Sequence, residues 1–506
     1  MHMVKECDAL VGFGKTLFPL LEARHASLST IPCIVIALGA FGRGALPFKT
    51  LHPFLNSNDT LVVSCSADQQ IARAFFPTVR IVLIPFSVNT EIFYPADAAT
   101  CSNFRNEHGL SSTSQLIFYA GRITVEKNLH TALRVFASLA PHLSDPYFFL
   151  AGPFLDMPFN ELSTVPVSYS RSLARAIEKL GIPEERVAYL GVLSADQLRI
   201  AYSSADVTLN LTLHHDENFG LGQLQSLACG TPVVATGWGG LHDTVRTECN
   251  GHRVPVTPTP LGVKVDWWDA LNAIYDRLVP PAGTIIDKDR NKLLLEQYSL
   301  AEFARKLTET LAAAVEGATP NVLPILPSEF ATEFWGECSP SERPHCTYRY
   351  DTRSFELYLR LIAYYAGSHG TPAEDANSDG PLMLAAPLSP GANGYLAVGD
   401  PLFPAEVLIP GNIKTDVLEI VRLFTTKPIN TLYQIETACN NSETSCQEAI
   451  SWMLDRGLLL RSNRVIARLS DDSLERSFSS PLFEIQTIDG DVIDFLVLRN
   501  WTAIGN

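Results

Sequence analysis

Short apolar runs recur along the first two thirds of the chain, and segments with helical spacing separate them. Buried runs that are bounded by turn residues and alternate with helix-length segments are typical of parallel sheets covered by helices. The pattern predicts two successive α/β units, over residues 1–107 and 108–316. The strand-like runs are 7–13, 31–41, 59–66, 79–85, 116–121, 147–152, 187–191, 207–212 and 232–236.

Helical periodicity is clearest at 130–140, 169–180 and 299–315. The last of these segments follows the second α/β unit, so we expect it to close that unit. Residues 93–103, FYPADAATCSN, are polar and rich in turn-forming types. We therefore interpret them as the linker between the two units.

The remaining residues show a different pattern. Residues 366–411 are rich in Gly, Pro, Ser and Ala, so we expect 317–411 to be an irregular linker or extension. Three helix-like segments and two strand-like runs follow, and together they predict a winged-helix-like module over 412–506. The helix-like segments are 415–424, 431–439 and 445–457, and the strand-like runs are 458–462 and 464–470.

Charge narrows the range of partners. The net charge is 38 − 54 = −16, which argues against a nucleic-acid partner or an anionic membrane surface. The third helix-like segment of the C-terminal module carries Glu448, with Glu443 just before it, but no basic residue before Arg456, so it is a poor DNA-reading helix. We find no apolar run long enough for a transmembrane segment.

The cysteines and the N-terminus bear on the compartment. The ten cysteines are scattered and lack zinc-pair spacing, and the N-terminus lacks the pattern of a secretory signal. These features predict a reduced, cytoplasmic protein. His214 and His215 precede Asp216, but adjacent side chains at a strand end point to opposite faces. We therefore expect no metal site.

Residues 216–240, DENFGLGQLQSLACGTPVVATGWGG, read as a loop, a helix, a buried strand and a glycine-rich turn. Gly220 and Gly222 allow a ligand to approach the backbone closely at the start of the helix. The N–H groups that are free there, together with the positive end of the helix dipole, favour a phosphate or sugar hydroxyls. Glu217, just before the helix, can accept hydrogen bonds from a sugar.

Residues 120–128, AGRITVEKN, directly follow a predicted strand. Arg122 and Lys127 would therefore lie at the carboxyl end of a parallel sheet, where ligands bind in open α/β folds. A guanidinium and an ammonium group at this spacing can hold a diphosphate and stabilise it as a leaving group.

The two motifs, in this order, resemble the retaining GT-B glycosyltransferases of family 4, also called the group 1 type. The intervening segments 187–198 and 202–212 follow the order of that family. The resemblance covers about 65–316 and is strongest over 116–245. It implies an α/β GT-B fold, with two Rossmann-like domains and a nucleotide-sugar donor (a UDP- or GDP-sugar) in the cleft between them. It also implies sugar transfer with retention to a glycan, lipid or small-molecule acceptor, with no metal and no cofactor beyond the donor.

The resemblance also assigns roles to individual residues. It implies that Arg122 and Lys127 bind the diphosphate as catalytic residues and that Glu217 contacts the donor sugar. The backbone N–H groups of Phe219, Gly220 and Leu221 are expected to bind the sugar and phosphate of the donor. The strand end at Gly191 and Val192 is expected to flank the base, and Gln225 is expected to contact the ribose.

Two departures from the family leave a second hypothesis open. Gln225 stands where the family has a second Glu that holds the ribose. A neutral hydrogen bond contributes about 0.5–1.5 kcal/mol against about 1.5–3 for a charged one, so the change weakens donor binding by about tenfold. In addition, the first domain resembles only the middle of its family counterpart, and the active-site His is not found in residues 36–44. The alternative is an inactive GT-B-like binding or scaffold protein.

Overall fold

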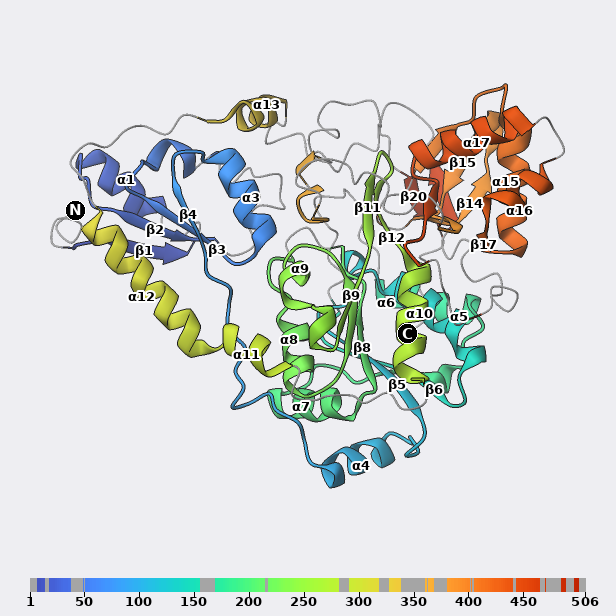
Figure 1. The fold of residues 1–506 in the computed structure, drawn as a ribbon, viewed down its shortest axis with the longest axis horizontal. Helices are drawn as coiled ribbons and strands as arrows, with labels where there is room; N and C mark the ends of the chain where they lie inside the picture. The colour runs from blue at the N-terminus through green and yellow to red at the C-terminus, as the bar shows by residue number, and fades with distance from the viewer. Residues whose placement is uncertain are drawn as a thin grey trace.

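The structure is a computed structural model (Figure 1). It describes residues 7–13, 18–37, 49, 51–154, 169–213, 217–281, 291–317, 327–337, 360–361, 363–367, 380–400, 402, 405–439, 443–464, 469, 484–487 and 496–499. Two parallel sheets with covering helices and a C-terminal extension make up this part of the chain. The expected α/β fold class with two parallel-sheet domains is confirmed.

The first domain contains a four-stranded parallel sheet in the order β1-β2-β3-β4. Its strands are β1 (Leu10–Phe13), β2 (Cys33–Ile36), β3 (Thr60–Val63) and β4 (Arg80–Leu83). Every residue of β2 and β3 is buried, as a continuous apolar run predicts for central strands. The other elements here are α1 (Phe18–Ala26), η3 (His52–Phe54) and α3 (Ser66–Phe75).

The second domain contains a six-stranded parallel sheet in the order β10-β9-β8-β5-β6-β7. From β5 the chain builds outward to β6 and β7, and then returns to the other side of β5 to add β8, β9 and β10. The boundary between β5 and β8 is therefore the topological switch point, and ligands of open α/β folds bind beside such a point at the carboxyl ends of the strands. The strands are β5 (Gln115–Ala120), β6 (Pro146–Ala151), β7 (Val187–Tyr189), β8 (Val207–Asn210), β9 (Val233–Thr236) and β10 (Gly251–Val254).

Helices cover both faces of the second sheet. Helices α5 and α10 bury their apolar residues against one face, and α7 and α8 pack on the other. A two-stranded hairpin of β11 (Val256–Thr259) and β12 (Gly262–Val265) extends from the sheet toward the C-terminal extension. The helices are η4 (Val125–Lys127), α5 (Leu129–Leu139), η5 (Ala140–His142), α6 (Tyr169–Lys179), η6 (Glu184–Arg186), α7 (Ala195–Ser204), α8 (Leu221–Ala228), α9 (Leu241–Thr244), η7 (Thr247–Cys249), α10 (Trp267–Leu278) and α11 (Lys292–Gln297).

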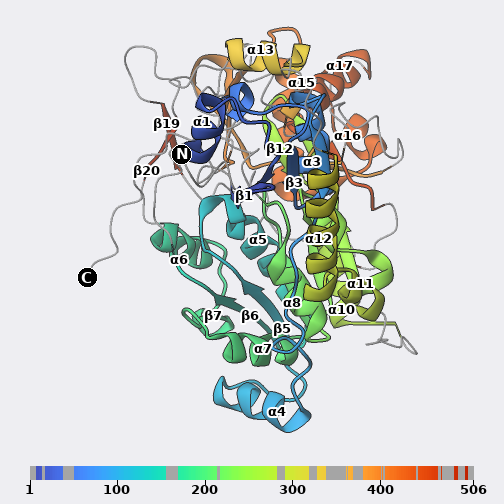
Figure 2. The same ribbon diagram turned by 90° about the vertical axis from the view of Figure 1, so that its left-hand side faces the viewer.

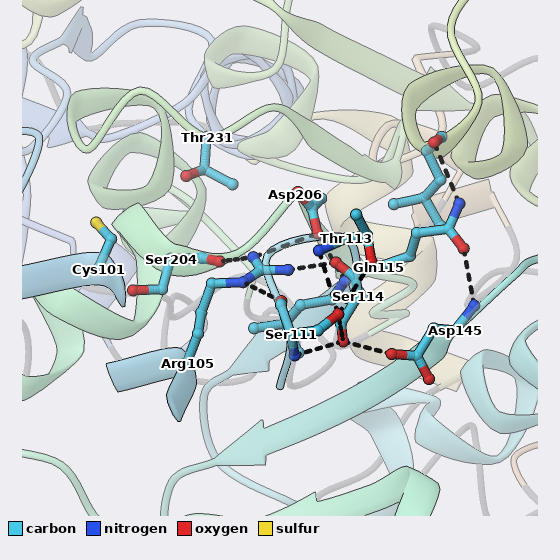
Figure 3. A network of polar contacts seen from close by, with 12 residues as sticks. Cys101, Arg105, Ser111, Thr113, Ser114, Gln115, Asp145, Ser204, Asp206 and Thr231 are labelled. Carbon is cyan, nitrogen blue, oxygen red and sulfur yellow. Dashed lines mark hydrogen bonds and ion pairs between the residues drawn. The ribbon is translucent and has the colours of Figure 1, made fainter. Parts of the chain in front are cut away.

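The segment interpreted as a linker, 93–103, is partly helical. Helix α4 (Ala98–Glu107) begins where the Asp97 carboxylate accepts a hydrogen bond from the Thr100 backbone, and it packs on α7. Arg105 anchors its last turn to the second domain, donating to the carbonyls of Ser204 in α7 and of Ser114, the residue before β5 (Figure 3). The linker interpretation is wrong for α4 because a local cap and a distant anchor stabilise a helix despite its polar composition.

The helix expected to close the second domain packs on the first. Helix α12 (Leu300–Glu316) buries an apolar stripe of Phe303, Leu307 and Leu311 against Ile34 and Val62 of the first sheet. Figures 1 and 2 both show it running back from α11 along that sheet. The helix was predicted correctly, but its assignment to the second domain was wrong, because helical periodicity indicates that a face is buried and not which sheet covers it.

The extension forms the three predicted helices, α15 (Lys414–Thr426), α16 (Leu432–Ala438) and α17 (Glu443–Asp455). The interpretation of 366–411 as loop is wrong over 382–408, where four strands form. Strand β13 pairs antiparallel with both β17 and β18, and β14, β15 and β16 form a separate meander. The strands are β13 (Leu382–Leu384), β14 (Leu388–Pro390), β15 (Tyr395–Val398), β16 (Ala405–Leu408), β17 (Ile429–Asn430) and β18 (Leu459–Arg461).

The hairpin expected of a winged helix is not seen in the described residues. Strand β18 was predicted to pair with 464–470, most of which lies outside the described residues, and its partner in the structure is β13. Leu382, Met383 and Leu384 are buried, but the turn-forming residues around them hide this short strand in the sequence pattern. The other described elements are α13 (Glu329–Glu337), η10 (Ala392–Gly394), β19 (Glu484–Thr487) and β20 (Leu496–Arg499).

Two further expectations concern cysteines and membranes. Cys439 and Cys446, which the sequence analysis treats as thiols, form a disulfide that joins the end of α16 to α17. Their Cα atoms lie 6.2 Å apart. None of the described helices combines the length and the apolarity that crossing a bilayer requires.

Candidate functional site

The two sequence motifs meet at the topological switch point of the second sheet. Lys127 lies at the end of η4, after β5, and Glu217 lies before α8, in the segment that follows β8. The Lys127 Nζ atom donates to the Glu217 Oε2 atom at 2.5 Å. The two side chains are 11% and 13% exposed, so this ion pair lies in a largely enclosed polar site that still opens to solvent.

The loop between β5 and α5 is held by buried hydrogen bonds. The Tyr119 hydroxyl donates to the Arg122 carbonyl at 2.7 Å. Burial raises the pKa of Tyr119 well above its ordinary value, so this hydroxyl stays protonated. Asn128 adopts the left-handed conformation before α5 and donates its side-chain amide to the Leu211 carbonyl, beyond the end of β8. These contacts fix the backbone from which Lys127 projects.

Arg122 lies at the same carboxyl edge, two residues after the end of β5, with an exposed side chain. The structure thus brings Lys127 and Glu217 into contact and leaves Arg122 at the rim.

The start of α8 requires a glycine. Gly220 has φ = 76°, and a Cβ atom there would lie 2.4 Å from the Leu241 Cδ2 atom, so a side chain would be both strained and crowded. Phe219 is buried, with its ring 5.6 Å from the ring of Phe86 and 5.7 Å from that of Tyr298. Within the described residues, the backbone N–H groups of Phe219, Gly220 and Leu221 have no hydrogen-bond acceptor. They remain available to an anion or to sugar hydroxyls.

The glycine-rich turn after β9 positions the loop that carries Glu217. The Gly240 N–H donates to the Glu217 carbonyl at 2.7 Å. A Cβ atom on Gly240 would lie 2.3 Å from the Phe219 nitrogen, so only glycine permits this close approach of the two backbones. The turn therefore acts on the site through the backbone of residues 217–219.

The other expected donor-binding residues lie further from the ion pair. Gln225 is half-buried in α8, one turn inside the helix. Gly191 and Val192 follow β7, at the carboxyl edge of the sheet but two strands away from β5, and Val192 is 70% exposed. The structure does not bring them into contact with Lys127. His214 and His215 lie outside the described residues, within which no cluster of metal-binding side chains occurs.

The first domain touches this site through residues that the sequence analysis missed. Ser66, at the start of α3, donates its backbone N–H and its hydroxyl to the two Asp243 carboxylate oxygens, each at 2.7 Å. Ser64 donates to the carbonyl of Asn218, the residue after Glu217, at 3.2 Å. The carboxyl ends of the two sheets therefore face each other across the site. The position of Ser64 and Ser66 at the end of the predicted strand-like run 59–66 was the available signal.

The extension also reaches the site, through Tyr365. Its ring stacks on Trp238 with centroids 5.4 Å apart, its carbonyl accepts from the Gly239 N–H, and its hydroxyl donates to Asp68 of α3. Tyr365 is fully buried. One residue of the extension thus contacts the glycine-rich turn of the second domain and a helix of the first. Nothing in the local sequence around Tyr365 indicates this contact.

Comparison with known proteins agrees, over residues 102–268, with the family resemblance of the two motifs. They match the sequence model of the family described as glycosyl transferases group 1. The match supports the group 1 glycosyltransferase family for residues 102–268 of this chain. The paired parallel sheets agree with the GT-B architecture that the resemblance implies.

Individual relatives are similar over part of their length. A D-inositol 3-phosphate glycosyltransferase of Mycobacteroides abscessus is 28% identical over 264 residues, which cover 51% of this chain and 54% of the relative. An uncharacterized glycosyltransferase of Methanocaldococcus jannaschii is 30% identical, over 42% of this chain and 49% of the relative. The chain spans about half the length of these curated relatives. Anabaena HepE, solved with UDP and glucose, is 17% identical with a TM-score of 0.48, covering 62% of this chain and 80% of that one.

Proposed function

We propose that the protein is a retaining glycosyltransferase of the family 4 type, which transfers a sugar from a nucleotide-sugar donor to an acceptor. The observation that carries this proposal is the meeting of Lys127 and Glu217 at the switch point, beside the start of α8. A cation, a carboxylate and a helix N-terminus within one crevice suit the diphosphate and the hydroxyl groups of a nucleotide sugar.

The proposed roles follow from this placement. Lys127 and the rim residue Arg122 would bind the diphosphate and stabilise it as it leaves, and Glu217 would accept hydrogen bonds from the sugar. Backbone N–H groups at Phe219, Gly220 and Leu221 would complete the contacts to phosphate and sugar. Gln225 would contact the ribose, and Gly191 and Val192 would flank the base. No metal or further cofactor is part of the proposal.

Ligand-induced stabilisation tests the donor site. We expect one of UDP, GDP or ADP, or a sugar derivative of one of them, to raise the melting temperature. At 100 times its dissociation constant a ligand stabilises the folded state by about 2.7 kcal/mol. The shift should disappear in Lys127→Ala and persist in the matched control Lys292→Ala, an exposed lysine in α11. No shift with any nucleotide would contradict the proposal.

Sugar transfer is the second test. The donor identified by stabilisation would be supplied with candidate acceptors, and the anomeric configuration of the product read by NMR. Because the M. abscessus relative is named for D-inositol 3-phosphate, this compound belongs in the first acceptor panel. A product of inverted configuration would contradict retention.

The scaffold alternative rests on Gln225, the neutral side chain in α8 where the family has an acid. It predicts nucleotide binding that is weak or absent and no turnover. Donor hydrolysis or transfer that is lost in Glu217→Ala would exclude this alternative.

A further inference from the structure

One turn of the extension, residues 363–367, packs closely against the glycine-rich turn that follows β9 and against the start of α9. Gly367 has φ = 74°, and a Cβ atom there would lie 2.6 Å from the His242 Nε2 atom. A residue with a side chain would therefore be both strained and crowded at this position. Tyr365 is the central residue of the turn, and it is fully buried.

Tyr365 contacts the glycine-rich turn through its ring and through its backbone. The ring stacks on Trp238, with 5.4 Å between the centroids and 30° between the planes. The Tyr365 carbonyl accepts a hydrogen bond from the Gly239 N–H at 2.7 Å. A Cβ atom on Gly239 would lie 2.1 Å from the Glu217 carbonyl oxygen and 2.8 Å from the Tyr365 Cδ1 atom. Gly239 therefore fills the space between the Glu217 backbone and the Tyr365 ring, with no room for a side chain.

The next residue of the turn completes the connection to the donor site. The Gly240 N–H donates to the Glu217 carbonyl at 2.7 Å, and the Glu217 carboxylate accepts from Lys127. Two adjacent peptide groups of one turn thus bind Tyr365 and Glu217. Because protein interiors are close-packed, a shift of one of these partners displaces the other.

The extension is also fixed to the first domain, through helix α3. The Tyr365 hydroxyl donates to the Asp68 Oδ1 atom, in the first turn of α3, at 2.8 Å. Phe330 and Phe334 of α13 pack on Phe75 at the end of the same helix, with ring centroids 5.3 and 5.7 Å apart. Tyr365 therefore lies between a helix of the first domain and the turn of the second domain that holds the Glu217 backbone.

We propose that Tyr365 is a positioning residue of the donor site: it fixes the glycine-rich turn, which in turn holds Glu217 where its carboxylate accepts hydrogen bonds from the donor sugar. Tyr365 acts through the turn, and the sugar is the part of the donor that depends on it. The inference rests on the proposed function, because that function assigns Glu217 to the sugar and Lys127 to the diphosphate. It extends the site beyond residues 102–268, over which the family model matches.

Calorimetric titration of the full chain with UDP, GDP, ADP and their sugar derivatives tests the proposal. Tyr365→Ala removes the stacked ring, so the nucleotide sugar should bind roughly tenfold more weakly, the size of a lost hydrogen bond to a carboxylate, while the affinity for the diphosphate stays nearly unchanged. In the Glu217→Ala background the same substitution should have no further effect, because both changes act on one contact. A loss that persists in that background, or an equal loss for both ligands, would overturn the proposal.

Conservative variants keep the test independent of folding. Tyr365→Phe keeps the ring but removes the hydrogen bond to Asp68, so the nucleotide sugar should bind about threefold more weakly. Asp68→Asn keeps an oxygen that accepts from the Tyr365 hydroxyl, and it should retain the wild-type affinity. Phe424→Ala, the matched control, removes a buried ring from a core formed mainly by the extension. It should lower the melting temperature without changing either affinity. A Phe424→Ala effect on the nucleotide sugar equal to that of Tyr365→Ala would contradict a specific role for Tyr365.

Hydrogen exchange of the ligand-free chain separates a failure of this inference from a failure of the proposed function. In peptides that cover residues 236–242, the amides of Gly239 and Gly240 should exchange about tenfold faster in Tyr365→Ala than in Phe424→Ala. If the wild type binds no nucleotide and this difference is present, the proposed function fails while Tyr365 still fixes the Glu217 backbone. Unchanged exchange at both amides would overturn the inference whether or not a nucleotide binds.

Discussion

The ion pair between Lys127 and Glu217 predicts that the Glu217 carboxylate competes with a bound diphosphate for the Lys127 ammonium group. The Glu217 carboxylate accepts a hydrogen bond from the Lys127 ammonium group. The proposed diphosphate needs a hydrogen bond from the same ammonium group. Glu217→Gln removes the negative charge while keeping the size of the side chain. We therefore expect the variant to bind the nucleoside diphosphate more tightly than the wild type does, although a proposed donor-site residue has been altered.

The magnitude follows from the burial of the pair. Both side chains are about nine-tenths buried, and a hydrogen bond between charged groups in such a place contributes about 1.5–3 kcal/mol. Lys127 has three N–H donors and can keep part of this contact when phosphate binds, so competition costs about 1 kcal/mol. Its removal corresponds to about fivefold tighter binding of the diphosphate.

The nucleotide sugar should behave differently from the diphosphate. Replacing a carboxylate acceptor by an amide weakens the proposed sugar contact by about 1 kcal/mol, which offsets the gain at the diphosphate. Calorimetric titration should therefore show the diphosphate about fivefold tighter and the nucleotide sugar nearly unchanged in Glu217→Gln. Glu316→Gln, at the exposed end of α12, is the matched control and should alter neither. Weaker binding of the diphosphate in Glu217→Gln would refute the reasoning, because it would mean that the carboxylate only positions Lys127.

Three further perturbations test the framework around the site. Arg24 donates to both carboxylate oxygens of Asp59, and the two side chains are 2% and 0% exposed. Arg24→Met should therefore lower the free energy of unfolding, measured in urea, by about 3–5 kcal/mol. A loss below about 1 kcal/mol would contradict this expectation. Burial raises the pKa of Asp266 from 3.8 to about 6. The resulting contribution to the free energy of unfolding, about 3 kcal/mol, is present below about pH 4 and should be lost as the pH rises through about 6. Asp266→Asn should lack this dependence of the free energy of unfolding on pH. Asp243→Ala removes the interdomain cap on Ser66, so it should lower stability by about 1 kcal/mol and enlarge the radius of gyration in X-ray scattering; an unchanged radius would show that other contacts hold the domains.

The strands and the local chemistry of the site could be predicted because short, continuous stretches of sequence determine both. Strands β5 and β8 are continuous apolar runs, and the residues that follow the carboxyl ends of such strands collect at one edge of a parallel sheet. The placement of Lys127 and Glu217 at this edge follows from that rule. Their direct contact does not, because it depends on strand order, which places β8 beside β5.

What the sequence did not reveal depends on partners that are distant along the chain. Helix α12 has a clear apolar stripe, but the stripe carries no information on which sheet covers it. Strand β13 is short and becomes recognisable only through pairing with β17 and β18, each more than forty residues away. The Ser66–Asp243 contact joins two domains whose relative orientation has no local signature.

The extension contacts both domains and the glycine-rich turn that holds the Glu217 backbone. Tyr365 is buried between Trp238 and Asp68, so one aromatic side chain packs on the second domain while its hydroxyl binds the first. The same residue accepts a hydrogen bond from Gly239, whose neighbour Gly240 fixes the backbone of Glu217. A change in the extension at Tyr365 would therefore be transmitted to Glu217 through two backbone contacts, without any altered residue in the donor motifs. Because of this connection, the donor-site measurements require the chain with its extension intact.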